Sequence, residues 1–420
     1  MKTTLLSVLL FACAFAMSQP KETQSFYSDA KKAYSAKDYS KFYEAIYKAY
    51  ELYPYHQGIL YQCAIASALM NKPEEAVSSL KKAILINVDF DLTNPDLGSL
   101  KNRNDFQDLL KLKTELNTAI VHSQTAFTLN DRQLHTEGIA YDSASDDFFV
   151  GSIHKRKIVR IDKNGSASDF TTSEQEGMTS VFGLKVDTRQ NLLWACTSPI
   201  TEMQNFDSLL SSFVYSYSLK DGRIKGKYSP PTNVKGSIFG DLVLDAQGNA
   251  FISDSRNNII FRVNKISQQL EKYFESPEFW NIQGITFSND GRYLFIADYI
   301  KGIFRLDTGT RQLTQLRCNL EVALKGTDGL TFYKSSLIAI QNGVNPQRVT
   351  RYDLNNDFTE IAHFEIIDRK HPDFNEPTMG ALVENEFYYI ANSQWSGYEE
   401  GTIKPPDQLQ DIVILKVNLD

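Results

Sequence analysis

The sequence predicts a multidomain α plus all-β protein in which a short α-helical repeat precedes a six-bladed β-propeller. Apolar residues recur with a 34-residue period and helical spacing between residues 25 and 120. From residue 121 onward, short alternating or β-branched runs separated by turn dipeptides replace the helical pattern. Six of these runs begin with a similar motif. A chain of 420 residues is also too long for one ordinary single-core domain.

The composition argues against several classes of partner. The chain has 44 Lys and Arg against 51 Asp and Glu, a net charge of −7, without a block of basic residues. We therefore expect no nucleic-acid partner, because such proteins carry basic patches. Beyond the N-terminus, no stretch is apolar and long enough to cross a bilayer, so we expect no transmembrane segment.

The first 18 residues have the pattern of a signal peptide. A Lys is followed by an apolar run from Leu5 to Ala16 and then by small residues, with cleavage expected after Ala16 or Ser18. We expect export to the periplasm or the medium. Lipoprotein anchoring at Cys13 is the alternative, although bulky Phe11 makes a poor lipoprotein motif.

Residues 19–120 are expected to form pairs of helices. Two segments align at the 34-residue spacing, with small residues where paired helices cross. The matching positions are Phe26 and Leu60, Ala30 and Ala64, Ile46 and Leu80, and Ala49 and Ala83. The pattern resembles the tetratricopeptide repeat, and a capping helix is expected after residue 95. The module is either a structural support for the next domain or a docking site for a protein partner.

Residues 121–420 are expected to form the propeller. The six inner strands begin at Glu137, Phe182, Gly240, Gln283, Asp328 and Met379, with spacings of 45, 58, 43, 45 and 51 residues. Radial repetition at a period near 50 is typical of a propeller. The last unit lacks a fourth strand, and residues 125–130, before the first blade, could supply it and close the ring.

The three cysteines after the signal peptide are interpreted as buried small hydrophobic residues. Cys63 lies in a helical pattern, whereas Cys196 and Cys318 lie in strand patterns. A bridge between Cys196 and Cys318 stays open, because an oxidising compartment would permit one.

Polar residues at the strand ends define a candidate site. The first residue of each inner strand faces the central channel, so Glu137, Gln283 and Asp328 are expected to converge on the axis. The ends of the second strands reach the same face and contribute Asp254, Asp298, Asn342 and Asn392, with His154 and Arg256 nearby. Asp254 and Asp298 have a second interpretation, in which they cap local turns.

The strand motifs resemble those of the gluconolactonase family, also called regucalcin-like or senescence-marker-protein-like. The segments IQGITFSNDGRYLFIADY and GTDGLTFYKSSLIAI carry the resemblance, which covers about residues 131–420. The family holds a divalent cation with a Glu, two Asn and an Asp. Glu137 and Asp328 match the Glu and the Asp, Gln283 replaces one Asn, and Gly240 replaces the other. Asp241 could reach into the position that Gly240 leaves open.

Two functions are compatible with these residues, and the sequence leaves open whether the protein is an enzyme. The first is a hydrolase of sugar lactones or related esters that depends on a divalent cation, with calcium expected because it prefers oxygen ligands. Asp328 would be a ligand and the general base, with Glu137 and Gln283 as ligands. The second is a non-catalytic propeller that binds a carbohydrate or peptide. The residues expected to contact substrate are His154, Asp241, Asp254, Arg256, Asp298, Asn342 and Asn392.

Overall fold

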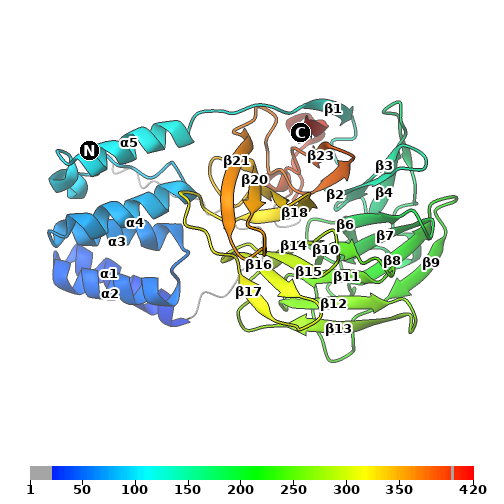
Figure 1. Ribbon diagram of the computed structural model, residues 1–420, viewed down its shortest axis with the longest axis horizontal. Coiled ribbons are helices and arrows are strands. Elements are labelled where there is room, and N and C mark those ends of the chain that lie inside the picture. The colour runs from blue at the N-terminus through cyan, green and yellow to red at the C-terminus, as the bar shows by residue number, and fades with distance from the viewer. Residues whose placement is uncertain (1–20, 399–401) are drawn as a thin grey trace.

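The protein consists of a helical module beside a ring of β-sheets. A computed structural model describes residues 21–398 and 402–420, so the predicted signal peptide lies outside the described residues. The helices run from Lys21 to Leu116 and the strands from Gln124 to Asn418. Figure 1 shows the helices packed to one side of the six sheets. The predicted fold class, helices followed by a six-bladed propeller, is therefore confirmed.

The helical module contains two pairs of antiparallel helices and a cap, and the alanines at its repeated positions are buried. Ala30 and Ala64 are 1% and 0% exposed, and Ala49 and Ala83 are both 0% exposed. These small side chains let the paired helices approach closely. The helices are α1 (Lys21–Ser35), α2 (Tyr39–Leu52), α3 (Gln57–Leu69), α4 (Pro73–Ile86), the 3-10 helix η1 (Pro95–Leu100) and α5 (Asn104–Leu116).

Side chains at the helix starts explain where α2 and α3 begin. The Asp38 carboxylate accepts a hydrogen bond from the Lys41 N–H, and His56 Nδ1 accepts one from the Ile59 N–H. Both bonds satisfy donors that the first turn of a helix leaves without a partner. Pro73 opens α4, where its missing N–H costs nothing.

Each of the first five blades is a four-stranded antiparallel sheet in chain order, with its first strand innermost. Blades 1 and 2 contain β2 (Thr136–Asp142), β3 (Asp147–Ser152), β4 (Lys157–Ile161), β5 (Ala167–Asp169), β6 (Ser180–Asp187), β7 (Leu192–Ser198), β8 (Phe213–Ser218) and β9 (Ile224–Tyr228). Blade 3 contains β10 (Phe239–Leu244), β11 (Ala250–Asp254), β12 (Ile259–Asn264) and β13 (Gln269–Glu275). Blades 4 and 5 contain β14 (Ile282–Phe287), β15 (Tyr293–Asp298), β16 (Gly302–Asp307), β17 (Leu313–Gln315), β18 (Thr327–Tyr333), β19 (Ser336–Gln341), β20 (Arg348–Leu354) and β21 (Ile361–Arg369).

The sixth blade joins the two ends of the propeller, as the sequence predicted. Its strands are β22 (Gly380–Val383), β23 (Glu386–Ile390), β24 (Ile412–Asn418) and β1 (Gln124–Leu129). Strand β1 pairs antiparallel with β24, so that Thr128 lies opposite Val413 and Leu129 opposite Ile412. The first strand of the chain is thus the outermost strand of the last blade. Short 3-10 turns lie at η2 (Gln175–Gly177), η3 (Trp395–Gly397) and η5 (Pro406–Gln408).

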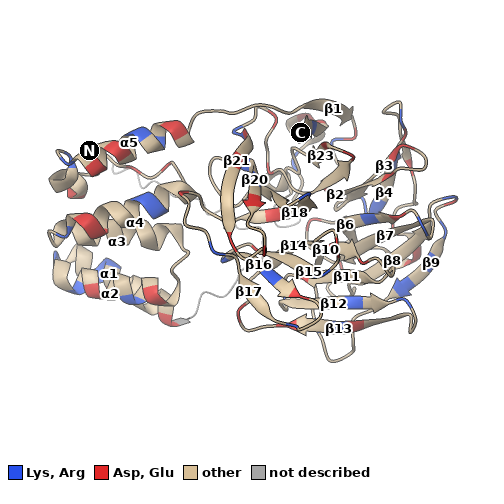
Figure 2. Ribbon diagram, viewed as in Figure 1, with Lys and Arg blue, Asp and Glu red and all other residues tan. Residues whose placement is uncertain are grey.

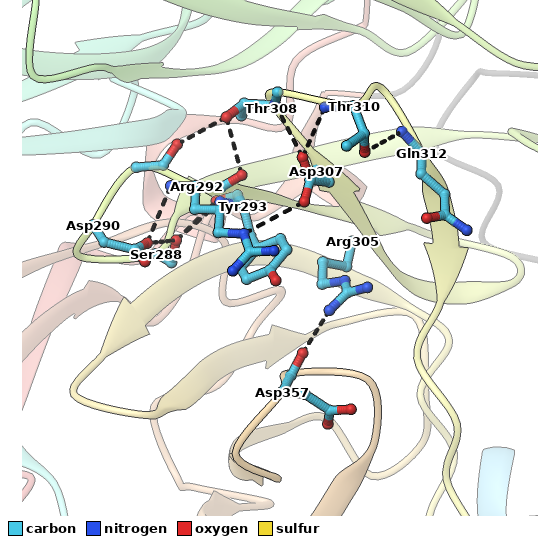
Figure 3. Close-up of polar contacts among 12 residues, drawn as sticks. Ser288, Asp290, Arg292, Tyr293, Arg305, Asp307, Thr308, Thr310, Gln312 and Asp357 are labelled. Carbon is cyan, nitrogen blue, oxygen red and sulfur yellow. Dashed lines mark hydrogen bonds and ion pairs between the residues drawn. The ribbon is translucent and has the colours of Figure 1, made fainter.

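Turns on one face of the propeller follow the inner strands and are stabilised by acidic side chains. In blade 4, Asp290 accepts hydrogen bonds from the Ser288 hydroxyl and the Arg292 N–H. Asp307 accepts N–H bonds from the next turn and lies 3.5 Å from Arg292 (Figure 3). The opposite face contains the starts of the inner strands, and all the predicted site residues belong to that face.

The helical module packs against this second face over blades 4 and 5. Tyr53 and Tyr55, between α2 and α3, lie 5.3 and 5.9 Å from the Trp280 ring, measured between centroids. Lys325 Nζ donates to the Tyr55 carbonyl at 2.9 Å, and Val344 packs into an apolar cluster with α3 and α4. The module therefore borders the face that contains the candidate site.

Backbone pairing joins the same two parts. The Asn345 N–H donates to the Ile86 carbonyl at 2.8 Å, and the Val88 N–H donates to the Asn345 carbonyl at 3.0 Å. Two helical pairs and a cap lack the three repeats that an independent solenoid needs. The propeller supplies the missing contacts.

Three properties of the described residues bear on the earlier expectations. Cys63, Cys196 and Cys318 are free thiols, so Cys196 and Cys318 do not pair. Figure 2 shows Lys and Arg interspersed with Asp and Glu over the helices and the blades. Among the described residues, no helix has the length and apolar character to cross a membrane.

Candidate active site at the propeller axis

A β-bulge at the start of five of the six inner strands places the axial residues in equivalent positions. In β2, β6, β10, β14 and β18 the pairing register shifts near the first residues, for example between Thr136 and Ile139 and between Thr327 and Leu330. A bulge redirects the side chains that it contains. Glu137, Gln283 and Asp328 lie within these bulges, so they share one level of the channel.

A glycine after the axial residue lets neighbouring inner strands touch. A Cβ on Gly138 would lie 2.0 Å from the Phe182 carbonyl oxygen, and one on Gly284 would lie 2.4 Å from that of Asp328. No side chain fits in either place, so the close approach requires glycine. The repeated motif of an axial residue followed by Gly therefore reflects blade contact at the axis.

Blade 3 departs from this pattern because Asp241 occupies the glycine position. Its Oδ1 accepts from the Leu242 N–H at 2.8 Å, and its Oδ2 accepts from the Ile285 N–H of the next blade at 3.1 Å. Burial raises the pKa of this carboxyl, and Lys185 partly opposes the shift. Asp241 was predicted to contact substrate or to fill the position beside Gly240, but its carboxylate bridges two blades.

Glu137 is a buried axial carboxyl with hydrogen-bond donors on one side. It is 3% exposed, and its Oε1 accepts from the Trp395 indole N–H and from the Ser393 hydroxyl. Burial raises the pKa of Glu137 well above its usual range, and the charge of Asp328 adds to the shift. The two carboxyl groups therefore lie close enough to repel each other when both are ionised.

Asp328 is partly exposed and is held by a chain of two hydrogen bonds. Asn342 Nδ2 donates to its Oδ2 at 2.8 Å, and the Tyr299 hydroxyl donates to Asn342 Oδ1 at 3.0 Å. Burial raises the pKa of Asp328 to about 7, the Asn342 bond opposes the rise, and Asp241 and Glu376 add to it. Asn342, predicted to contact substrate, is thus bonded to the candidate base.

Gln283 covers the position that Gly240 leaves without a side chain. Its Oε1 would lie 3.4 Å from a Cβ built on Gly240, while its Nε2 donates to Asn281 Oδ1 at 2.7 Å. With the amide nitrogen engaged, the oxygen is the atom next to the vacant position. The longer side chain of Gln thus reaches into the space beside Gly240.

Glu137 and Asp328 each offer a carboxylate, and Gln283 offers an amide oxygen. All three are oxygen ligands of the kind that hard cations prefer. Calcium and magnesium take such ligands and complete their shells with water. Within residues 21–398 and 402–420, no three His, Cys, Asp or Glu side chains converge closely enough to hold a metal ion. A divalent cation would therefore be held by the three protein oxygen donors named here and by water.

The sequence did not identify Glu376 as part of this site. Its charge raises the pKa of both Glu137 and Asp328, and its Oε2 accepts from the Ser396 N–H at 3.4 Å. Glu376 belongs to the long segment before blade 6, not to a strand start. The only sequence feature that could have indicated a role for Glu376 is its position as an acidic residue in an unusually long connection.

Asp254 and Asp298 take the turn-capping role that was the second interpretation of these residues. Asp298 is 0% exposed and accepts four backbone N–H bonds, including those of Trp280 and Lys301. Asp254 is also 0% exposed and accepts backbone N–H bonds from Ile238 and from the following turn. These bonds occupy both carboxylates, so neither is available to a substrate.

Among the described residues, none of the remaining predicted contacts forms a hydrogen bond with Glu137, Gln283 or Asp328. Asn392 bridges β23 and β24, because its amide donates to the Asp411 carbonyl and accepts from the Val413 N–H, both at 2.8 Å. Arg256 is exposed. His154 is 2% exposed, and its Nδ1 lies 2.8 Å from the Glu202 carbonyl oxygen, in the insert of blade 2.

Comparisons with known proteins show similarity of fold. No family model and no curated protein match the chain. A gluconolactonase from Xanthomonas campestris is 12% identical, with a TM-score of 0.46 over 71% of this chain and 90% of its own. A luciferin-regenerating enzyme is 11% identical, with a TM-score of 0.49 over 72% and 96%. An inactive virginiamycin B lyase from Staphylococcus aureus is 14% identical, with a TM-score of 0.48 over 71% and 99%. At these identities the likeness concerns the fold and not the activity.

Proposed function

We propose that the protein is an exported hydrolase that opens sugar lactones or related esters at the propeller axis. The observation that supports this most is the pair of axial carboxyl groups, Glu137 and Asp328, with raised pKa values. Perturbed carboxyl groups cluster at catalytic sites. The resemblance of the strand motifs to gluconolactonases supports the choice of substrate.

A divalent cation, with calcium the best match, is part of this proposal. Glu137, Gln283 and Asp328 would hold it, and it would polarise the substrate carbonyl and lower the pKa of a bound water. Without a cation, two neighbouring carboxyl groups resist simultaneous ionisation, and the charge of Asp328 accounts for part of the raised pKa of Glu137.

Asp328 is the proposed general base. The pKa of Asp328 is raised to about 7 in the cation-free protein, and a bound cation would lower it, so that the carboxylate is ionised and can accept a proton. The hydrogen bond from Asn342 holds one carboxylate oxygen in a fixed orientation. Proton transfer from water to Asp328 would produce the nucleophile that attacks the lactone carbonyl. The ring C–O bond then breaks, the leaving ring oxygen takes the proton from Asp328, and the product is the open hydroxy acid.

A pH-stat assay of the full chain on aldonolactones tests this proposal, because ring opening releases a proton. We expect calcium-dependent hydrolysis of D-glucono-1,5-lactone or D-galactono-1,4-lactone above the spontaneous rate. Loss of a general base typically costs 10² to 10⁴ in rate, so Asp328→Asn should lower kcat by about 100-fold. Asp221→Asn, in a turn on the opposite face, is the matched control. Hydrolysis that EDTA and Asp328→Asn both leave unchanged would exclude this site.

A second function is a non-catalytic propeller that binds a carbohydrate or peptide. Gly240 favours it, because the residue offers no ligand where the resemblance expects an Asn. In this case the helical module, interpreted as tetratricopeptide-like, would be the docking module for a protein partner. The same lactones would then bind without being hydrolysed, which calorimetry on the full chain can detect.

The domain limits and export belong to the proposal as well. We place the signal peptide at residues 1–18, the helical module at 19–120 and the propeller at 121–420. Expression with and without the first 18 residues, followed by fractionation of the cells, tests export. Retention of both forms in the cytoplasm would contradict it.

A further inference from the structure

A pocket of about 680 Å³ opens beside blades 1 and 2, on the same face as the axial site but apart from it. The insert that follows β7 forms most of its wall, and this insert accounts for the long spacing between the second and third blades. None of the axial trio lines the pocket. Its lining residues are His154, Thr201, Glu202, Met203, Gln204, Asn205, Phe206 and Ile403.

The wall of the pocket is anchored to blade 1. The Gln204 N–H donates to the His154 carbonyl at 2.9 Å, and Arg156 Nη1 donates to the Gln204 carbonyl at 3.3 Å. Asn205 Nδ2 donates to Glu174 Oε1 at 2.8 Å, and Arg156 pairs with the same carboxylate at 2.9 Å. These bonds hold the insert against blade 1, so the wall of the pocket has a defined position.

Glu202 is a buried carboxyl group in this wall without a cationic partner. It is 7% exposed, and among the described residues no Lys, Arg or His forms an ion pair with it. Burial raises the pKa of this carboxyl, and bonds from its own N–H and from Thr201 only partly oppose the rise. A buried carboxyl group is costly unless hydrogen-bond donors reach it. A ligand with donor groups would satisfy it.

His154 supplies a second buried acceptor. A carbonyl oxygen can only accept, so the Nδ1 atom facing the Glu202 carbonyl must carry the proton. Burial lowers the pKa of His154, which keeps the ring neutral and leaves a lone pair on Nε2. Among the described residues, Nε2 is buried and has no hydrogen-bond partner. Within the described part of the chain, the pocket wall thus contains one acceptor without a hydrogen-bond partner, His154 Nε2, beside the buried carboxyl group of Glu202.

The aromatic ring and the amide side chains complete the chemistry of the pocket. Phe206 is 42% exposed, so part of its ring is open to a ligand. Gln204 and Asn205 can both donate and accept hydrogen bonds. Acceptors, amides and an exposed ring together match a molecule with hydroxyl groups on its edge and C–H groups on its face.

We propose that this pocket binds a neutral carbohydrate whose hydroxyl groups donate to Glu202 and His154 and whose ring lies against Phe206. An organic cation fits less well, because the lining has a single carboxyl group and otherwise offers neutral polar and apolar side chains.

A stack of aromatic rings separates the pocket from the axis. The His154 ring lies 5.3 Å from Tyr398, Tyr398 stacks at 4.2 Å on His135, and His135 lies 4.5 Å from Trp395, measured between ring centroids. The Trp395 N–H then donates to Glu137. The pocket is therefore separate from the axial site, and the proposal for it does not depend on whether the axis catalyses hydrolysis.

Binding of methyl glycosides to the full chain tests the proposal, because these sugars contain no lactone to hydrolyse. The probes are methyl glycosides of glucose, galactose and mannose, measured by saturation-transfer NMR and calorimetry. A lost hydrogen bond to a charged group weakens binding by about tenfold or more, and we expect this of Glu202→Gln. Phe206→Ala removes the apolar surface under the sugar ring and should weaken binding by about tenfold as well. Leu209→Ala, in the same insert and 88% exposed, is the matched control and should bind normally.

Three results would overturn the proposal. The first is that no glycoside binds. The second is that Glu202→Gln and Phe206→Ala bind as tightly as the parent protein while Asp328→Asn does not, which would locate the ligand at the axis. The third is that tetramethylammonium binds more tightly than every glycoside. Since Phe206 is partly exposed, its replacement should leave the melting temperature unchanged. This separates loss of the pocket from loss of the fold.

Discussion

Acidic residues on one face of the propeller differ in how many backbone N–H groups reach them. Asp298 accepts four such bonds, whereas the only side-chain bond that Asp328 accepts among the described residues comes from Asn342. N–H donors stabilise the ionised form of a carboxyl group and so tie it to a structural role. The number of local donors therefore separates the capping residues from the candidate catalytic ones.

Replacing Asp298 should destabilise the protein much more than replacing Asp328. Asp298→Ala leaves four buried N–H groups without an acceptor, which should lower the free energy of unfolding by about 3 kcal/mol. Asp328→Ala removes the partner of one partly buried amide and should cost about 1 kcal/mol or less. Urea unfolding followed by tryptophan fluorescence measures both. Equal losses would contradict the division between capping and axial residues.

The pKa of Asp328 predicts how stability depends on pH in the cation-free protein. Its pKa is raised from 3.8 to about 7 on folding, so the folded state binds the proton more tightly than the unfolded state. This contribution is complete below about pH 4 and is lost as the pH rises through 7. In EDTA, the parent protein should lose roughly 2 kcal/mol over this window relative to Asp328→Asn, allowing for partial exposure.

Thermal melts of both proteins between pH 4.5 and 8 measure this difference. If calcium binds at the axis, adding it should restore stability to the parent protein near pH 7.5 and have little effect on Asp328→Asn. Parallel pH profiles for the two proteins in EDTA would show that the Asp328 carboxyl has an ordinary pKa.

At the scale of the strands, the closing strand β1 connects the stability of the first and last blades. Leu129 is 3% exposed and belongs to an apolar cluster with side chains of blades 1 and 6. Leu129→Ala should lower the free energy of unfolding of the propeller by 2–5 kcal/mol, the usual cost of such a truncation. Calorimetry measures this against Thr128→Ala, an exposed neighbour on the same strand. Equal effects would argue against closure by β1.

The strand pattern could be predicted because it repeats, and the details of the site could not because they break the repeat. The six motifs that start the inner strands established the blades, and the missing fourth strand of the last unit indicated closure by residues 125–130. The bonding of Asp241 could not be predicted from its position beside Gly240, which suggested an axial role. Its contact with the Ile285 N–H depends on the spacing of two blades. A single strand contains no information about that spacing.

For the whole molecule, the docked helical module should unfold together with the propeller. Val344 is 5% exposed and packs with Leu60, Ala83 and Ile86 of the module. Val344→Asp buries an unpaired charge there and should separate the single thermal transition into two, with faster proteolysis of the module. Val121→Asp makes the same change at a position that is 47% exposed and should leave one transition. A single transition in both variants would show that the Val344 cluster does not couple the module to the propeller.

The relation between module and site could not be predicted from the sequence. The helical pairs were predicted from their small buried residues, but which blades they contact depends on Trp280, Lys325 and Val344, which lie in loops without a repeating pattern. Glu376 was missed for the same reason. Residues in long connections reach the site through tertiary structure, whereas the axial residues follow the period of the blades.

Crystals of the full chain grown with Mn²⁺ in place of calcium would test the central claim most directly, because anomalous scattering locates the ion. The account predicts one peak on the propeller axis, bounded by carboxylate oxygens of Glu137 and Asp328 and by the amide oxygen of Gln283, and its absence from crystals of Asp328→Asn. An axis without a peak at saturating Mn²⁺, or a peak that persists in Asp328→Asn, would contradict a cation site built from these three residues.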